Sequence, residues 1–251
     1  MSALVIAARE LRGMFLSPLA WSILGVVQMI LGFMFLSQVD YYMMIQPRIA
    51  NMEGAPGITD LIVAPLFGNA GVILLLVTPL ITMRLISEER RNRTLSLLFS
   101  APVSMADIIL GKYLGTLAFL LIMVGMIVLM PLSLLFGGGL DLGKLAACAM
   151  ALSLLLAAFA ALGLYMSSLA GQPTVAAIGS FGVLLLLWII DWSSNDGDKS
   201  DSVLHYLSLL RHYESLLKGL VNTTDLLYFL LFIFTFLVLS IHRLDNDRLQ
   251  K

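Results

Sequence analysis

Two glutamates and a histidine are the residues of this chain whose types could support hydrolysis. Glu88-Glu89 with Arg93 spells E-E-x-x-x-R, and His242 with Asn246 spells H-x-x-x-N. A glutamate and a histidine can together activate a water molecule, but this general-base chemistry needs both groups in one shielded site. The glutamates lie in a strongly charged stretch, so the pattern alone is weak evidence for catalysis.

These two pieces resemble parts of the prenyl-protein intramembrane endopeptidases. The further histidine that such an enzyme would carry within an apolar segment is missing, because His205 and His212 lie in the polar stretch before the last apolar run. A glutamate-dependent intramembrane protease is therefore kept only as an alternative function. It requires Glu88 to be buried close to His242.

Three other motifs lack the context that their chemistry needs. The segment GGLDLGKL at 138–145 approaches a phosphate-binding loop, but Leu145 stands where the Mg²⁺-binding Ser or Thr belongs. SLAGQ at 168–172 is better interpreted as a short turn. Met123, Met126 and Met130 share a helical face, which indicates flexible packing rather than a Cu(I) site. The sequence predicts no catalytic residue, bound cofactor, metal site or nucleic-acid partner for this chain.

The elements that must position any functional residue are apolar helices. Apolar residues make up 59% of the 251-residue chain and charged residues only 12%, whereas about a quarter of an average soluble protein is charged. We predict an all-α integral membrane protein, a single domain covering 1–251, with six transmembrane helices because six uncharged runs are long enough to span a bilayer. These runs are 19–39, 61–83, 113–136, 145–169, 174–190 and 226–241.

The distribution of charge predicts how the chain is oriented. With both termini in the cytoplasm, ten of the fifteen Lys and Arg residues fall on the inner side, and ten of the sixteen acidic residues fall on the outer side. This is the bias of the positive-inside rule. Arg9 and Arg12 precede an apolar run that is too long for a cleavable signal peptide. We therefore expect both termini, and the charged segment 84–104, to be cytoplasmic.

Three segments outside the six runs show helical patterns. Residues 3–16 place Leu4, Ala8, Leu11 and Phe15 on one stripe, which suits a helix lying flat at the inner interface and ending at Pro18. Residues 203–220 alternate apolar and polar residues with helical spacing, which predicts a short outer helix. In the segment 84–104, Ser104 is placed to cap a helix that continues into the third run.

The stretch TMRLISEERRNRTLSLLFSAPVSMADIILGKYLG at 82–115 resembles the ABC-2-type transporter permeases. In that family the region carries two acidic residues, a basic pair, Gly-Thr-Leu, a Pro-containing break and a helix that ends in Gly-Lys. Residues 207–248 are similar to the subgroup of gliding-motility and nitrous-oxide-reductase-maturation permeases. One departure concerns Arg93, which occupies the position where the family has a glycine before Thr94, so the resemblance does not by itself support a glycine-dependent turn there.

The resemblance implies a permease subunit, expected to be an exporter, in a bacterial inner membrane. It implies a second copy of the chain or a close paralogue, a dimer of separate ABC ATPase subunits that hold ATP and Mg²⁺, and room for an accessory periplasmic protein. The segment after the second run would be a coupling helix that docks on the ATPase. Its expected interface residues are Glu88, Glu89, Arg90, Arg91, Arg93, Thr94, Leu95, Leu97, Leu98, Phe99, Ala101 and Pro102.

Two further groups complete the expected sites. Arg9 and Arg12 of the interfacial helix would pack beside the coupling helix, and the outer helix would close the external end of the pathway through His205, Arg211, His212 and Glu214. The alternatives to a permease are the protease described above and a passive scaffold or channel subunit. The transported substrate does not follow from the sequence, because apolar runs do not reveal which faces meet.

Overall fold

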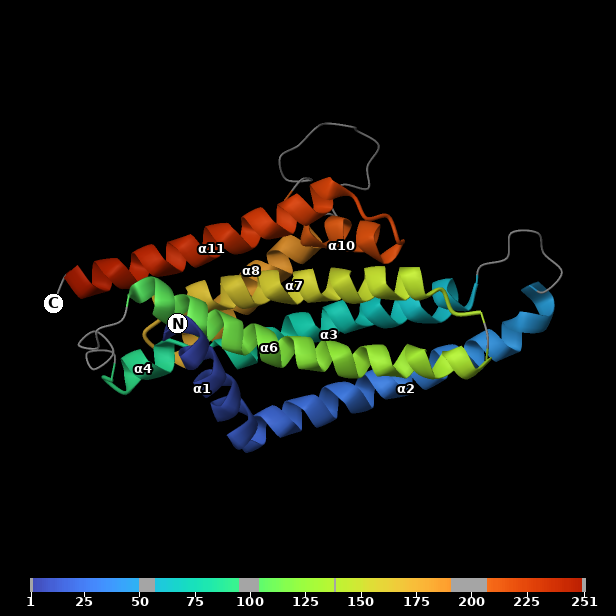
Figure 1. Cartoon of the computed structure of the whole chain (residues 1–251), viewed down its shortest axis with the longest axis horizontal. Coiled ribbons are helices and arrows are strands. Elements are labelled where there is room, and N and C mark those ends of the chain that lie inside the picture. Colours follow the sequence, from blue (N-terminus) through green and yellow to red (C-terminus); the bar gives the residue numbers. More distant parts are fainter. Residues whose placement is uncertain (1, 50–56, 95–103, 138, 191–206, 250–251) are drawn as a thin grey trace.

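The computed structural model describes residues 2–49, 57–94, 104–137, 139–190 and 207–249, and within these ranges every regular element is a helix (Figure 1). Except for a few residues at the element ends, these ranges are helical throughout. In chain order the elements are α1 (Ser2–Leu16), α2 (Pro18–Ile49), η1 (Thr59–Val63), α3 (Ala64–Thr82), α4 (Ser87–Arg91), α6 (Met105–Leu132), η2 (Ser133–Gly137), α7 (Leu142–Leu169), α8 (Pro173–Ile189), α10 (Leu209–Leu217) and α11 (Thr223–Leu249).

Five helical segments are long and apolar enough to cross a membrane, and they contain α2, α3, α6, α7 and α11. The sixth apolar helix, α8, has 17 residues, which at about 1.5 Å per residue reaches roughly 25 Å. This length is slightly short of a typical hydrocarbon core, which a bilayer accommodates by local thinning. The predicted all-helical membrane fold is confirmed.

The core of the bundle is built around α7. Of its most apolar window 72% is buried, against 28% for α2 and 22% for α11. α7 packs against α3, α6, α8, α10 and α11, and its many alanines and Gly163 let the neighbouring backbones come close. A side chain at Gly163 would collide with Thr82 of α3. The helices around α7 leave broad apolar faces exposed, as expected of surfaces that meet lipid.

The first long helix ends later than predicted. We expected the run 19–39 to end before Asp40, but α2 continues to Ile49 with Pro47 near its end. A single acidic residue is not a helix breaker, and Pro47 lies close enough to the end to be tolerated. The predicted break at Pro18 is correct, because α1 ends at Leu16 and Pro18 opens α2.

Side-chain caps determine where two other helices begin. Ser104 caps α6 as predicted, because its Oγ accepts a hydrogen bond from the backbone N–H of Asp107 at 3.1 Å. Asp141 caps α7 by accepting from Gly143 N–H at 2.8 Å and Lys144 N–H at 3.1 Å. In the stretch that mimics a phosphate-binding loop, residues 141–145 are thus an ordinary helix start, and SLAGQ forms the last residues of α7 and the turn that leads to α8.

Both ends of the chain and α4 lie at the same end of the bundle, while α10 and the start of α11 lie toward the other (Figure 1). Of the outer helix predicted at 203–220, the described part of the chain contains α10, which covers Leu209–Leu217 after the cap residue Ser208. Residues 203–206 lie outside the described part of the chain.

Helix α1 crosses α6 at very short range. A Cβ atom at Gly111 would lie 2.9 Å from the carbonyl oxygen of Ala3, and one at Gly115 would lie 2.9 Å from that of Ala7. This spacing of two glycines four residues apart is the small-xxx-small pattern that lets helices pack tightly in membranes. Because these two glycines have no side chain, α1 can lie directly against α6.

The predicted apolar stripe of α1 is divided between two environments. Leu11 and Phe15 pack against the core as a stripe should, but Leu4 is 68% exposed and Ala8 is also exposed. The packed face is rotated because the glycines of α6 receive the side that carries Ala3 and Ala7. Leu4 therefore lies on the outer surface of the protein.

Candidate functional site

The candidate site is the charged end of the bundle around α4. This helix has only five residues, and a serine of α7 fixes its start: Ser167 Oγ accepts from the backbone N–H groups of Ile86 at 3.0 Å and Ser87 at 3.1 Å, and it donates to Met83 O at 2.9 Å. One hydroxyl thus satisfies the first N–H groups of the helix, which have no partner within a helix.

The end of α4 is closed by a turn at Arg93. The backbone N–H of Thr94 donates to Glu89 O at 3.0 Å, and that of Arg93 donates to Arg90 O at 3.2 Å. This pair of hydrogen bonds is the Schellman motif, which needs a residue in the left-handed backbone conformation directly after the helix. Arg93 takes that conformation with φ of 57°. The turn therefore forms with an arginine in the left-handed position, at some cost in strain.

A buried lysine joins α4 to two other helices. Lys112 of α6 has only 4% of its side chain exposed, and its Nζ lies 2.9 Å from Glu89 Oε1 and 3.5 Å from Glu10 Oε1. Both carboxylates are themselves largely shielded, with 23% and 21% of their side chains exposed. A lysine at this depth is stable only when paired. The three residues therefore tie α4, α1 and α6 together.

A second group of charges joins α4 to the end of α11. The Arg90 guanidinium forms an ion pair with Asp247 and donates to the carbonyl oxygen of Ser168 at 2.9 Å. Arg243 pairs with the other oxygen of Asp247 at 3.6 Å, one helical turn away. Charge-assisted bonds of this kind, partly shielded from solvent, are stronger than surface pairs. Arg90 thus connects α4 with both α7 and α11.

The predicted coupling residues therefore divide into two groups. Glu89 and Arg90 face the bundle and are used in these internal pairs, while Glu88 and Arg91 are exposed. Arg93 and Thr94 are also exposed after the turn. The other predicted interface residues, Leu95, Leu97, Leu98, Phe99, Ala101 and Pro102, lie outside the described part of the chain. The interface itself stays a prediction.

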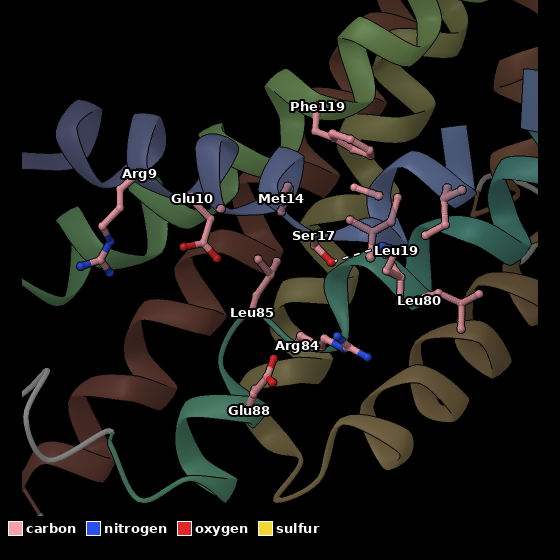
Figure 2. Close-up of a pocket in the computed structure, with 14 residues that line it drawn as sticks. Arg9, Glu10, Met14, Ser17, Leu19, Leu80, Arg84, Leu85, Glu88 and Phe119 are labelled. Atoms are coloured by element: carbon pink, nitrogen blue, oxygen red, sulfur yellow. Dashed lines mark hydrogen bonds between the residues drawn. The ribbon is translucent and has the colours of Figure 1, made fainter. Parts of the chain in front are cut away.

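A cavity of about 400 Å³ opens beside α4, between α1, the start of α2 and the end of α3. Figure 2 shows Glu10 and Glu88 projecting from elements on its two sides, with Arg84 beside Glu88 and Arg9 outermost on α1. Arg9 therefore lies at the rim of this cavity. Arg12 is exposed on α1 and does not line it.

The residues that a protease would need are not arranged for one. Glu88 and His242 are both exposed, whereas general-base hydrolysis inside a membrane requires a shielded pair. No group of three or more His, Cys, Asp or Glu residues within the described ranges could hold a metal ion.

The predicted outer gate is a packed element. Tyr213 of α10 is fully buried and donates to Phe67 O at 2.6 Å, and burial raises its pKa well above the ordinary value, so that the phenol keeps its proton. His212 is also buried, with Nδ1 at 2.6 Å from Asp225 Oδ1. Arg211 and Glu214 are exposed, and His205 lies outside the described part. Their role as a gate stays a prediction.

Sequence reasoning missed the partners of the charged segment. These are Glu10, Lys112, Ser167, Ser168, Arg243 and Asp247. Lys112 could have been suspected, because it is a lone charge that follows the apolar residues of IILGKYLG, where an unpaired ammonium is costly. Its partners could not be named, since they lie far away in the sequence.

The fold and the charged end define a multi-pass helical membrane protein with a short, internally tied helix at the end where both termini lie. Residues 22–249 match the family described as ABC-2 family transporter protein, and the chain belongs to that family. It is therefore a membrane component of an ABC transporter, and such permeases work with an ABC ATPase partner. No curated protein shows significant sequence similarity to the chain.

Proposed function

We propose that this chain is the permease subunit of an exporter, that separate ATPase subunits dock on the exposed side of α4, and that α4 transmits their movement. Glu88 and Arg91 offer charges of both signs to a partner, while Glu89 and Arg90 hold the same helix to the bundle. One short helix thus has an outward face for docking and an inward face for transmission.

This proposal rests on the ion pairs, because they determine which helices move when α4 is displaced. Through Lys112 a displacement of α4 reaches α1 and α6, and through Asp247 it reaches α11. Coupling between distant sites requires a physical element whose arrangement both sites bias. The binding of ATP, with Mg²⁺, to the partner would act by favouring one arrangement of the bundle.

The remaining parts of the proposal concern assembly and location. A second copy of the chain or a close paralogue completes the transporter, in a bacterial inner membrane with both termini cytoplasmic. In Figure 1, α4 and both termini lie at the same end of the bundle. This arrangement and the charge bias of the sequence support the proposed orientation. α10 would close the outer end of the pathway. The subgroup, an accessory periplasmic protein and the direction of export rest on the resemblance alone.

The decisive experiment separates docking from transmission. The exposed pair Glu88→Ala/Arg91→Ala should reduce co-purification of the ATPase without lowering the thermal unfolding midpoint of the permease. Lys112→Met should leave docking largely intact but reduce substrate-dependent or permease-dependent stimulation of ATP hydrolysis. Asp245→Ala, an exposed change at the same end of the bundle, is the matched control. Normal docking and coupling in the Glu88/Arg91 variant would show that the ATPase binds elsewhere.

A further inference from the structure

The cavity beside α4 has one charged half and one apolar half. Its charged side carries Arg84 and Glu88, with Arg9 and Glu10 from α1, and its apolar side is made by Leu19, Ala20, Ile23, Leu80 and Ile81 together with neighbouring residues. Its volume of about 400 Å³ falls within the roughly 300–1,000 Å³ typical of small-molecule pockets. We propose that it binds a zwitterionic phospholipid with a primary ammonium group, of the phosphatidylethanolamine type.

The apolar half lies at a depth that a lipid chain can reach. Ile23 is more than one helical turn into α2, and Leu80 and Ile81 are the last apolar residues of α3 before its end. Leu80 is 47% exposed. These residues belong to membrane-crossing helices, so a water-soluble partner would have to enter the hydrocarbon region to fill this half. A lipid acyl chain, by contrast, belongs to that region of a membrane.

The charged half fits a headgroup that carries both signs. Neither Arg84 nor Glu88 makes a side-chain hydrogen bond or an ion pair with the described residues, although both line the cavity; in Figure 2 the Arg84 guanidinium points away from the Glu88 carboxylate. A guanidinium binds phosphate oxygens through two parallel N–H groups. A carboxylate accepts hydrogen bonds from a primary ammonium, which has three N–H donors.

The balance of charge selects among lipid headgroups. Glu10 is already paired with Lys112, so the charged groups of the lining left for a ligand are Arg84 and Arg9 for the phosphate and Glu88, the one available carboxylate of this lining, for the ammonium. An anionic lipid brings no ammonium group to Glu88, so the Glu88 carboxylate would face the lipid phosphate with no cation between them. A choline headgroup has no N–H to donate to Glu88. The ethanolamine headgroup satisfies both kinds of charge.

The test uses the purified, delipidated permease in detergent without any ATPase, so its result is independent of the coupling proposal. Native mass spectrometry would follow titration with phosphatidylethanolamine, phosphatidylcholine and phosphatidylglycerol that carry the same acyl chains. We expect the ethanolamine lipid to bind about tenfold more tightly than the other two, which corresponds to one charge-assisted hydrogen bond.

Variants test the contacts of the lipid headgroup and of the acyl chain separately. Arg84→Gln should weaken all three lipids, because it removes a phosphate partner, whereas Glu88→Gln should weaken only the ethanolamine lipid. Ile23→Trp should weaken all three by filling the apolar half. Arg12→Gln, an exposed arginine of α1 that does not line the cavity, is the control.

The proposal is overturned if the three lipids bind equally, or if Arg84→Gln and Glu88→Gln leave binding of the ethanolamine lipid unchanged. Loss of headgroup preference in Glu88→Gln with retained binding of the glycerol lipid would support the assignment of the ammonium to Glu88.

Discussion

The two ends of the bundle hold their short helices by different forces. At one end α4 is held by ion pairs through Lys112 and Asp247, with Ser167 at its start. At the other end α10 is held mainly by buried side chains, with Tyr213 fully enclosed between α3, α7 and α8, and the buried pair His212–Asp225 adds one polar tie to α11. Apolar packing falls off sharply when surfaces separate, whereas ion pairs are directional but can exchange partners.

This difference suits the roles proposed for the two helices. A packed element such as α10 has one good position and resists displacement, because protein interiors are close-packed. An element held by charges can move a short distance and form new pairs with a partner. The comparison predicts that changes at the α10 end act mainly on stability, while changes at the α4 end act on stability and on coupling.

The largest effect should come from removing Tyr213. Tyr213→Ala leaves a large cavity in the α10 end, and we expect the free energy of unfolding to fall by about 3–5 kcal/mol, as for other buried aromatic residues. Chemical or thermal unfolding in detergent would measure it. Tyr213→Phe keeps the packing and loses only the bond to Phe67 O, for about 1 kcal/mol. Equal losses in both variants would show that the hydrogen bond, not the packing, holds α10.

Removing Lys112 should have the next largest effect. Lys112→Met leaves Glu10 and Glu89 without their cation, and loss of one partner from a shielded pair costs about 3 kcal/mol. The triple variant Glu10→Gln/Glu89→Gln/Lys112→Met has no unpaired charge and should regain most of this stability in the same unfolding measurement. It should still couple poorly, because the tie between α4 and α6 is gone. A stable, fully coupled triple variant would contradict the role of the pairs in transmission.

Crowding the contact between α1 and α6 should have a moderate effect. A methyl group at Gly115 would press on the backbone of Ala7, so Gly115→Ala should destabilise the protein by about 1–3 kcal/mol. Gly125→Ala is a matched control on the same helix, since nothing lies within 4 Å of its added Cβ. The control should be neutral or slightly stabilising, because alanine favours a helix over glycine. Equal unfolding midpoints for both variants would mean that α1 adjusts freely.

The sequence predicted the membrane class and the helix starts because these depend on local patterns. Long uncharged runs identify apolar helices, and Ser104 and Pro18 act on the next few residues. The rotation of α1 could not be predicted, because it is decided by Gly111 and Gly115 about a hundred residues away. The same holds for the charged segment: its composition was evident, but the division into paired and exposed residues depends on Lys112 and Asp247.

The smallest effect, a slight gain in stability, should come from the turn after α4. Arg93 holds a left-handed conformation that costs a residue with a side chain roughly 1–2 kcal/mol and costs glycine little. Arg93→Gly should therefore stabilise the turn, but glycine also gains freedom in the unfolded chain and the contacts of Arg93 are lost. We expect a net gain of at most about 1 kcal/mol, seen as slower hydrogen exchange at the Thr94 amide, which bonds to Glu89 O. Asn92→Gly, at a position with φ of −80°, should bring no gain. Faster exchange in Arg93→Gly would mean that the contacts of the arginine side chain, rather than the backbone motif, close α4. The part of the bundle that is held by charged side chains would then extend one turn beyond Arg90.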